Sequence, residues 1–378
     1  MKVFLLSLLG QPLFALLLFW TLRICTRKGS LIRRIGLWFI LLELLLFLTA
    51  FFTRRSMSTE TLTAVLRGFN DYYVGTMMFL CWTYIGIALI YLVFRFTRLR
   101  KHPKRAVLRQ RLMTILFLAM IPITILLCVI GTRNTYNPKV VHHRIEIPKQ
   151  AGVDSLRLAL VTDIHVGEII TPKHVAHLAE MVRPYDPDYV LVGGDIIDYD
   201  TRYAFRPDVE SSLRSLHHDP SHIIYILGNH EYYYHPAQKE KWLKSLGILL
   251  KDSVIPLADN LYLIGRDDRT NDSRASLAQL MRQVPQGAAT ILLDHQPSEP
   301  RMEREAGIDL ALHGHTHDGQ FIPFKWVVGL HFEKSHGLYK RGGTTYYVSS
   351  GFGVAGSPFR VGTHSEIAIL DLHFAPSN

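Results

Sequence analysis

Four long apolar runs near the N-terminus limit what this chain can fold into more than any other feature of its sequence. They cover residues 3–22, 35–53, 74–94 and 112–131. A helix that crosses a bilayer needs about 20 mostly apolar residues, and each run is long enough to supply one. The first run follows Lys2 as a signal peptide would, but it lacks a small-residue cleavage site and three more runs follow it. We therefore predict a transmembrane four-helix region over residues 1–131.

The loops between the runs predict how the chain is oriented in a membrane. Residues 23–34 carry five Lys or Arg and residues 95–111 carry eight, whereas residues 54–73 carry three, offset by Glu60 and Asp71. Basic loops stay on the cytoplasmic side of a membrane. The two strongly basic loops are therefore predicted to be cytoplasmic. Both termini, together with everything after residue 131, would then lie outside the cytoplasm.

The uneven spread of charge and cysteine excludes two further kinds of site. Residues 1–131 contain 17 basic and 3 acidic side chains, whereas the rest of the chain contains 25 basic and 29 acidic ones. The pI of about 9.4 therefore reflects the membrane-flanking loops, and we expect no nucleic-acid partner. All three cysteines lie in or beside the apolar runs. A metal site after residue 131 would have to use His, Asp, Glu or Asn side chains.

After residue 131 the pattern changes to that of an α/β or α+β domain. Its short apolar runs predict buried strands, and the stretches between them predict helices, an alternation that indicates layered sheets flanked by helices. The predicted strands are residues 157–162, 189–192, 223–227, 290–293 and 310–312, and the helices include residues 172–182 and 236–245. We expect residues 132–150 to form a linker and a first edge strand, and residues 151–378 to form the domain itself.

Polar side chains that can bind metals follow all five predicted strands. In strand order they are Asp163 and His165; Asp195 and Asp198; Asn229, His230 and Glu231; Asp294 and His295; and His315 and His317. An open α/β sheet places its site at the carboxyl ends of its strands. Other histidines, such as His217 and His218, fit no ligand spacing and are expected at the surface.

The pair His315 and His317 indicates what such a cluster would bind. Two histidines separated by one residue on an extended strand point the same way, and Gly314 lets the backbone approach closely. Hard and borderline cations accept imidazole, carboxylate and amide ligands, and a carboxylate can bridge two of them. Ordinary polar residues at strand ends are the alternative, but five motifs in order favour a two-metal centre.

In these motifs the sequence resembles the calcineurin-like metallophosphoesterases. The family pattern DxH, GDxxD, GNH[DE], a lone His and GHxH is matched at residues 163–165, 194–198, 228–231, 295 and 314–317. The similarity covers about residues 140–375. The segment SSGFGVAGSPFR, followed by Glu366, is similar to a branch that includes membrane-attached bacterial phosphoesterases. The resemblance implies a two-sheet α/β sandwich with helices on both outer faces. Together with the four apolar runs, the similarity to that branch predicts a multi-pass protein of the bacterial inner (cytoplasmic) membrane.

The resemblance also implies roles for individual residues. One divalent metal ion would be held by Asp163, His165, Asp195 and His317, and a second, bridged to the first by Asp195, would be held by Asp195, Asn229, His295 and His315. The ions could be Mn, Zn or Fe. His230 would face the substrate phosphate, to stabilise its charge or protonate the leaving oxygen, and Asp198 would orient His230. The alternative role of Asp198 is to cap the following turn.

The predicted function is metal-dependent hydrolysis of a phosphate ester or anhydride. Four membrane spans exceed what an anchor needs, which favours a lipid-linked phosphate or pyrophosphate, such as a phospholipid or a polyprenyl pyrophosphate, at the outer face of the membrane. Residues 232–234 and Phe205 are expected to contact its lipid chains, and core packing is the alternative for residues 232–234. Other hypotheses are a non-catalytic phosphoesterase-like binding or sensor module, a cytosol-facing nucleotide-lipid pyrophosphatase, and transport or sensing by the helices, for which Glu43 is the intramembrane candidate.

Overall fold

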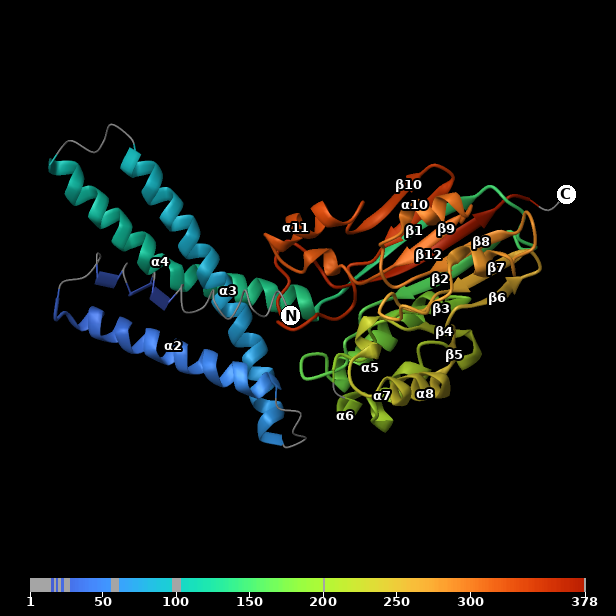
Figure 1. Ribbon diagram of the computed structural model, residues 1–378, viewed down its shortest axis with the longest axis horizontal. Coiled ribbons are helices and arrows are strands. Elements are labelled where there is room, and N and C mark those ends of the chain that lie inside the picture. The colour runs from blue at the N-terminus through green and yellow to red at the C-terminus, as the bar shows by residue number, and fades with distance from the viewer. Residues whose placement is uncertain are drawn as a thin grey trace. The chain divides into compact units, whose positions relative to one another are not determined.

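The chain divides into two units, residues Met1–Val129 and Ile130–Asn378 (Figure 1). The computed structural model describes residues 15–16, 18–19, 22–23, 28–55, 61–96, 103–199 and 201–376. Each unit has its own apolar core. The division falls beside residue 131, where the sequence pattern changes.

Three helices account for most of the described part of the first unit. They are α2 (Leu31–Arg55), α3 (Thr61–Phe96) and α4 (Pro103–Tyr136), of which the last turns, from Ile130 onward, belong to the second unit. On α3 one stripe, which includes Tyr73, Met77 and Leu80, is buried, while apolar residues such as Leu89 and Ile90 stay exposed. A helix that is apolar all round is typical of a membrane span or a deeply buried core.

The predicted four-helix transmembrane region is not confirmed. Among the described residues, two helical segments are long and apolar enough to cross a bilayer, Asp71–Ile90 and Thr114–Tyr136. The run at residues 35–53 does form helix α2, but it is not one of these two segments. Most of the run at residues 3–22, and the side chain of Glu43 in α2, lie outside the described residues.

The second unit contains two six-stranded sheets. Their strand orders are β1-β12-β2-β3-β4-β5 and β10-β11-β9-β8-β7-β6. The strands are β1 (Lys139–Ile147), β2 (Ser155–Val161), β3 (Tyr189–Gly193), β4 (Ile223–Ile226), β5 (Ile248–Leu249), β6 (Ser253–Ala258), β7 (Leu261–Gly265), β8 (Ala289–Leu293), β9 (Leu310–His313), β10 (Gly337–Arg341), β11 (Thr344–Val348) and β12 (Glu366–Phe374). Strands β2 to β5 are parallel, as are β7, β8, β9 and β11.

Helices cover the outer faces of both sheets. These helices are α5 (Pro172–Val182), α7 (Pro207–Arg214) and α8 (Pro236–Leu246) on the first sheet and α9 (Leu277–Met281) and α10 (Pro300–Glu305) on the second. The remaining helical elements are α6 (Thr201–Ala204), α11 (Phe324–His331), η2 (Arg183–Tyr185), η3 (Pro220–His222), η4 (Asn229–Tyr232) and η5 (His317–Gly319). The predicted two-sheet α/β sandwich with outer helices is confirmed.

Alternation along the buried strands builds the layers. On β2, Leu158 and Leu160 pack in the core between the two sheets, whereas Ala159 and Val161 pack against the outer helices. Successive residues of a strand point to opposite faces, so a strand covered on both sides has to be apolar at every position. This explains why the predicted strands are continuous apolar runs.

The segment predicted as a linker is mostly regular structure. Residues 132–136 continue helix α4, and only Asn137 and Pro138 separate it from β1, which does lie at a sheet edge as predicted. The helix extends past its apolar run because it makes tertiary contacts: Arg360 N donates to Gly131 O at 3.0 Å, and Asn134 Nδ2 donates to Arg360 O at 3.0 Å.

Candidate metal centre

The predicted ligands lie in loops that follow β2, β3, β4, β8 and β9. Five of these residues have a positive φ, namely Asp163 (53°), His165 (52°), Asp195 (51°), His315 (68°) and His317 (48°). Left-handed backbone is uncommon for residues other than glycine, costs about 1–3 kcal/mol each, and gathers at functional sites. The chain therefore places this strain at the residues predicted to bind metal.

Asp163, His165 and His317 form one group of donor atoms. His317 Nε2 lies 3.5 Å from Asp163 Oδ1 and 3.1 Å from His165 Nε2. His165 Nε2 lies 4.0 Å from Asp163 Oδ1. All three residues are buried, and these donor atoms could hold one metal ion. The pKa of His317 is held well below its ordinary range, mainly by burial and to a smaller extent by the neighbouring His165 and Arg360. The His317 imidazole is therefore neutral.

Asp195, His295 and His315 form a second group. His295 Nε2 lies 3.1 Å from Asp195 Oδ2, and the other ring nitrogen of His295 lies 2.8 Å from Gly193 O, which fixes the orientation of the ring. Asp195 Oδ2 also lies 3.8 Å from His165 Nε2 in the first group. The Asp195 carboxylate is therefore shared by both groups, as a bridging ligand requires.

Unpartnered donor atoms show that this set fits cations. Asn229 Oδ1 and His295 Nε2 are buried without a hydrogen-bond partner among the described residues, although His295 Nε2 lies beside the Asp195 carboxylate. Buried polar atoms normally have a partner, and a metal ion would supply one. Imidazole, carboxylate and amide oxygen together suit Mn, Zn or Fe. Ligation by the seven predicted residues stays a prediction.

The structure brings His230 next to Asp198. His230 Nδ1 lies 2.9 Å from the backbone O of Asp198 and 3.1 Å from its Oδ1. His165 Nδ1 lies 3.4 Å from the same Oδ1, so one carboxylate serves two imidazoles. Burial lowers the pKa of His230, but Asp198 and Asp195 outweigh it and raise this pKa to about 9. Burial raises the pKa of Asp198, but His165 and His230 outweigh it and lower this pKa to about 2.

Glu231 positions the loop after β3, a role that the sequence did not reveal. Its carboxylate accepts hydrogen bonds from the backbone N–H groups of Asp195, Ile196, Ile197 and Gly228, at 2.8–3.0 Å. A Cβ on Gly228 would collide with Asp195, so the two loops meet at a distance that only glycine permits. Glu231 therefore fixes the backbone of the shared ligand.

Arg360 contacts the His317 ring, and it was not predicted from the sequence as part of the site. Its buried guanidinium donates to the carbonyl oxygens of Ser350 (2.6 Å) and Gly353 (2.7 Å), and its Nη2 lies 3.1 Å from His317 Nδ1. Glu366 holds the same segment, because its carboxylate accepts from Ser350 N at 2.9 Å. The motif SSGFGVAGSPFR thus forms a support for His317.

The geometry predicted for His315 and His317 is wrong, although their placement together is correct. Strand β9 ends at His313, and both residues lie beyond it in left-handed backbone. The two side chains therefore do not point the same way from a strand. His317 joins the donor group of Asp163 and His165, whereas His315 joins that of Asp195 and His295. The close approach expected at Gly314 is confirmed, since a Cβ there would collide with the Asp163 carboxylate.

Comparisons with known proteins agree with this site. A family model described as calcineurin-like phosphoesterase matches residues 156–319. An uncharacterized metallophosphoesterase of Campylobacter jejuni is 32% identical over 266 residues, which cover 68% of this chain and 69% of that one. The chain belongs to the calcineurin-like phosphoesterase family. Its predicted class, a metallophosphoesterase, is confirmed.

Two other relatives bear on the length and attachment of this calcineurin-like phosphoesterase. An uncharacterized metallophosphoesterase of Helicobacter pylori is 36% identical over 225 residues. The match covers 57% of this chain and 60% of the length of that relative. A Bos taurus protein named "transmembrane protein with metallophosphoesterase domain" is 29% identical over 287 residues, covering 67% of this chain and 62% of that one. With the two candidate spans, this name suggests membrane association. The membrane-attached bacterial branch stays a prediction.

Aromatic rings surround His230 in this phosphoesterase. The rings of Tyr199 and Tyr233 each lie 5.0 Å from the His230 ring, and both tyrosines are more than one-third exposed. Tyr232 instead turns inward, where its hydroxyl donates to Asp267 at 2.6 Å. Phe205, which was also expected to contact lipid chains, instead packs against Trp242 in the core, with ring centroids 5.1 Å apart.

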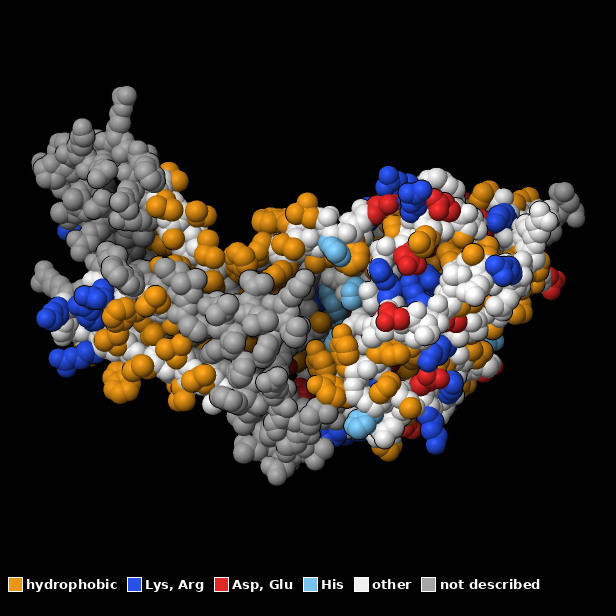
Figure 2. Space-filling model, in the orientation of Figure 1, with side chains coloured by type: hydrophobic (Ala, Val, Ile, Leu, Met, Phe, Trp, Pro, Cys, Tyr) orange, Lys and Arg blue, Asp and Glu red, His pale blue; other side chains and the backbone are white. Residues whose placement is uncertain are grey.

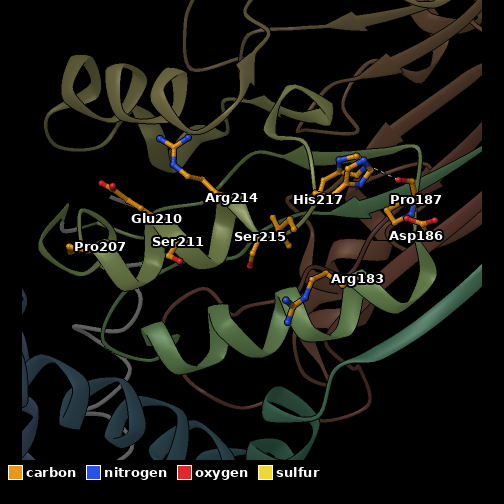
Figure 3. A pocket seen from close by; sticks show the side chains of 11 residues that line it. Arg183, Asp186, Pro187, Pro207, Glu210, Ser211, Arg214, Ser215 and His217 are labelled. Atoms are coloured by element: carbon orange, nitrogen blue, oxygen red, sulfur yellow. Dashed lines mark hydrogen bonds between the residues drawn. The ribbon is translucent and has the colours of Figure 1, made fainter.

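A pocket of about 790 Å³ lies apart from the candidate metal centre (Figure 3). It is lined by residues of η2 and α7 with the segment that follows each, including Arg183 and Arg214, and by none of the predicted site residues. His217, expected at the surface, is buried beside it, and its Nε2 donates to Pro187 O at 3.1 Å. We do not assign the phosphoesterase site to this pocket.

Proposed function

We propose that this chain hydrolyses phosphate esters or anhydrides at a centre of two divalent metal ions. One observation carries the proposal: the Asp195 carboxylate lies within reach of donor atoms from both ligand groups. The first ion would be held by Asp163, His165, Asp195 and His317, and the second by Asp195, Asn229, His295 and His315. When bound, the two ions would polarise the phosphoryl oxygens and lower the pKa of a shared water.

His230 and Asp198 would handle the proton. The Asp198 backbone oxygen and carboxylate both lie near His230 Nδ1, so this nitrogen carries a proton and Nε2 is left for the substrate. Because the pKa of His230 is raised to about 9, its imidazole is protonated at neutral pH. Its Nε2–H can then donate to a phosphoryl oxygen or to the leaving oxygen, as a general acid does.

The proposed substrate is a membrane lipid that carries a phosphate or pyrophosphate, such as a phospholipid or a polyprenyl pyrophosphate. Two candidate spans and a relative named as a transmembrane protein support a multi-pass membrane location. The exposed rings of Tyr199 and Tyr233 beside His230 offer an apolar edge for such a molecule. From the loop charges we propose a bacterial inner membrane, with the catalytic unit on the outer side. The bilayer is then the proposed partner, and nucleic acid is not one.

Metal analysis and a substrate panel would test this function. The full chain, purified in detergent, is stripped of metal, reloaded with Mn, Zn or Fe, and assayed on bis-p-nitrophenyl phosphate, phospholipids and polyprenyl pyrophosphates. We expect about two ions per chain and hydrolysis of the small diester and of at least one lipid. Two bound ions with no hydrolysis of any compound would favour a non-catalytic binding or sensor module. Cleavage of nucleotide-lipid pyrophosphates alone would favour the cytosol-facing alternative.

A further inference from the structure

Helix α11 (Phe324–His331) is apolar and exposed, in contrast to α5, α7 and α8, which each bury apolar side chains. All of its residues are described, and none is buried. The side chains of Trp326, Val327 and Leu330 are 64%, 56% and 89% exposed. Figure 2 shows apolar side chains gathered over this helix. By comparison, α5 buries Val175 and Leu178 against the first sheet.

An exposed apolar helix needs a partner, because apolar surface in water is unfavourable and such patches mark interaction sites. Three occupants are conceivable: a bilayer, the N-terminal helices of this chain, or a second copy. The contacts of the segments next to α11 favour one of them.

The segment that leads into α11 is joined to the end of α4. Ile322 N donates to Val361 O at 3.0 Å, just before α11 begins. The neighbouring Arg360 is hydrogen bonded to Gly131 and Asn134 of α4, at 3.0 Å in both cases. The candidate membrane span Thr114–Tyr136 ends in these turns of α4. The place where the chain would leave a bilayer is thus linked to α11 through a few hydrogen bonds to the backbone of residues 360–361.

The composition of α11 also suits the surface of a bilayer. Tryptophan, leucine and valine on one helix, with His331 at its end and Lys334 just after, are typical of helices that lie in the membrane interface. Lys325 is not counted with them, because its Nζ donates to Asp318 Oδ2 at 2.6 Å. Basic side chains there can meet anionic headgroups.

We propose that α11 is a membrane-docking helix, which inserts Trp326, Val327 and Leu330 into the headgroup boundary of the bilayer that α4 crosses. The docking depends on the membrane attachment proposed above, but not on hydrolysis. Its consequence is the position of the metal centre. Phe332, directly after α11, has its ring 6.2 Å from the ring of His315, and Thr316 donates to Ser335 O at 2.6 Å. A docked α11 therefore holds the loop that carries His315 and His317 next to the lipid surface.

Site-directed fluorescence on the full chain tests the proposal without measuring activity. With Cys25, Cys81 and Cys128 replaced by Ser, a single cysteine is introduced as Leu330→Cys and labelled with the environment-sensitive dye NBD. The protein is reconstituted in vesicles of phosphatidylethanolamine and phosphatidylglycerol, with or without brominated acyl chains. Met302→Cys on α10 is the matched control, because Met302 is also an exposed apolar side chain, with 57% of it exposed against 89% for Leu330.

We expect blue-shifted NBD emission at position 330 that brominated lipid quenches, and unshifted, unquenched emission at position 302. Emission at position 330 that matches position 302 would show an undocked helix and overturn the proposal. A blue shift at position 330 without quenching by brominated lipid would mean that protein covers α11, either the N-terminal helices or a second copy, and would equally overturn it.

A second arm links docking to lipid access. The double variant Trp326→Asp with Leu330→Asp changes only exposed side chains, so its fold should survive. Because both changes replace an apolar side chain that would enter the bilayer by a charged one, we expect at least about tenfold lower turnover of lipid in vesicles. Turnover of bis-p-nitrophenyl phosphate should not change. Equal turnover of vesicle lipid by variant and wild type would contradict the docking role, whereas loss of both activities in both proteins would count against the proposed function instead.

Discussion

Asp195 is the residue on which the two ligand groups depend. Its Oδ2 lies 3.1 Å from His295 Nε2 and 3.8 Å from His165 Nε2, while its Oδ1 accepts a hydrogen bond from the backbone N of His230 at 2.8 Å. Burial raises the pKa of Asp195, but His295 and its other histidine neighbours outweigh burial and hold this pKa well below its ordinary range. The carboxylate is thus ionised and ready to bind a cation.

Asp195 and His230 should respond differently to replacement. Asp195→Ala removes a carboxylate shared by both groups, so bound metal and activity should be lost together. His230→Ala should lower turnover about 10²–10⁴-fold, which is typical of a general acid, and leave metal bound. Metal content by mass spectrometry and hydrolysis of bis-p-nitrophenyl phosphate measure the two effects. His177→Ala, on the exposed face of α5, is the control, and equal metal loss in the Asp195 and His230 variants would contradict these roles.

At the scale of elements, η4 and the loop after β3 act as one piece because Glu231 joins them. Its carboxylate accepts four backbone hydrogen bonds, at 2.8–3.0 Å. The pKa of Glu231 is raised mainly by burial and further by the nearby Asp195. The ionised form of this carboxylate is therefore unfavourable in its surroundings. The hydrogen bonds offset that cost and fix the loop.

Glu231→Gln should therefore destabilise the second unit and weaken its metal site. The new NH₂ group would face backbone N–H groups and leave some of them unpaired, at about 1–3 kcal/mol each. We expect the Tm to fall by roughly 5–15 °C and metal affinity to fall with it. Glu240→Gln, which changes a partly exposed partner of Lys244 and Lys251, is the matched control. If both variants melt like the wild type, Glu231 does not hold the loop.

The pair of His336 and Glu366 ties the segment before β10 to the start of β12. His336 Nε2 donates to Glu366 Oε2 at 2.8 Å. Burial lowers the pKa of His336, but Glu366 outweighs it and raises this pKa above its ordinary value of 6.5. Burial raises the pKa of Glu366, but His336 outweighs it and lowers this pKa from 4.5 to about 2. Asp318 and Lys325 also face His336.

The two shifts define a pH window for the stability that this pair contributes. The raised pKa of His336 stabilises the fold fully below pH 6.5, and this contribution is lost as the pH rises through the folded pKa. The lowered pKa of Glu366 stabilises the fold above pH 4.5 and is lost as the pH falls toward about 2. The wild type should therefore melt at a higher temperature than the His336→Gln variant, and this difference in Tm should be largest between pH 4.5 and pH 6.5. The difference should shrink at alkaline pH. A difference that is constant from pH 5 to pH 9 would exclude this coupling.

At the scale of the whole molecule, the end of α4 belongs to the catalytic unit. Besides the hydrogen bonds of Gly131 and Asn134 to Arg360, the ring of Tyr136 stacks on His174 with centroids 4.6 Å apart. Because Arg360 also supports His317, the last turns of α4 contact the second layer of residues around the metal centre.

Truncation should separate this structural role from membrane attachment. A fragment of residues 137–378 lacks the contacts of Gly131, Asn134 and Tyr136, so it should be less stable than a fragment of residues 130–378 by about 2–4 kcal/mol. Thermal melting compares the two. The longer fragment should hydrolyse a small diester nearly as well as the full chain and turn over vesicle lipid much less. If it handled both substrates as well as the full chain, the lipid hypothesis would fail.

The orientation of the chain is a separate prediction at this scale. Two basic loops on the cytoplasmic side require the second unit to lie outside the cytoplasm. Alkaline phosphatase fused after residue 376 should therefore be active in bacterial cells. A green fluorescent protein fused at the same position should not fluoresce, because it would be exported unfolded through the Sec pathway. The opposite pattern would overturn the charge argument and favour cytosolic nucleotide-lipid pyrophosphates as substrates.

The sequence by itself determined the layers of the second unit and the composition of its site. Continuous apolar strands such as β2 and β3 require cover on both faces, and the polar residues after each strand had to meet where the carboxyl ends of the strands meet. Both features depend on short-range patterns with fixed periods. For that reason Asp163, Asp195, His230 and Asp198 could be predicted to gather at one place without a structure.

Only the tertiary structure decided how these residues are held and what surrounds them. The left-handed backbone of His315 and His317, the support from Arg360 and Glu366, and the four hydrogen bonds to Glu231 join segments that are far apart in the sequence or depend on loop conformation, for which the sequence has no periodic signal. The same is true of α11. No prediction from the sequence covered this segment, and only the packing around it leaves Trp326 and Leu330 exposed, because no layer of the sandwich covers that segment among the described residues.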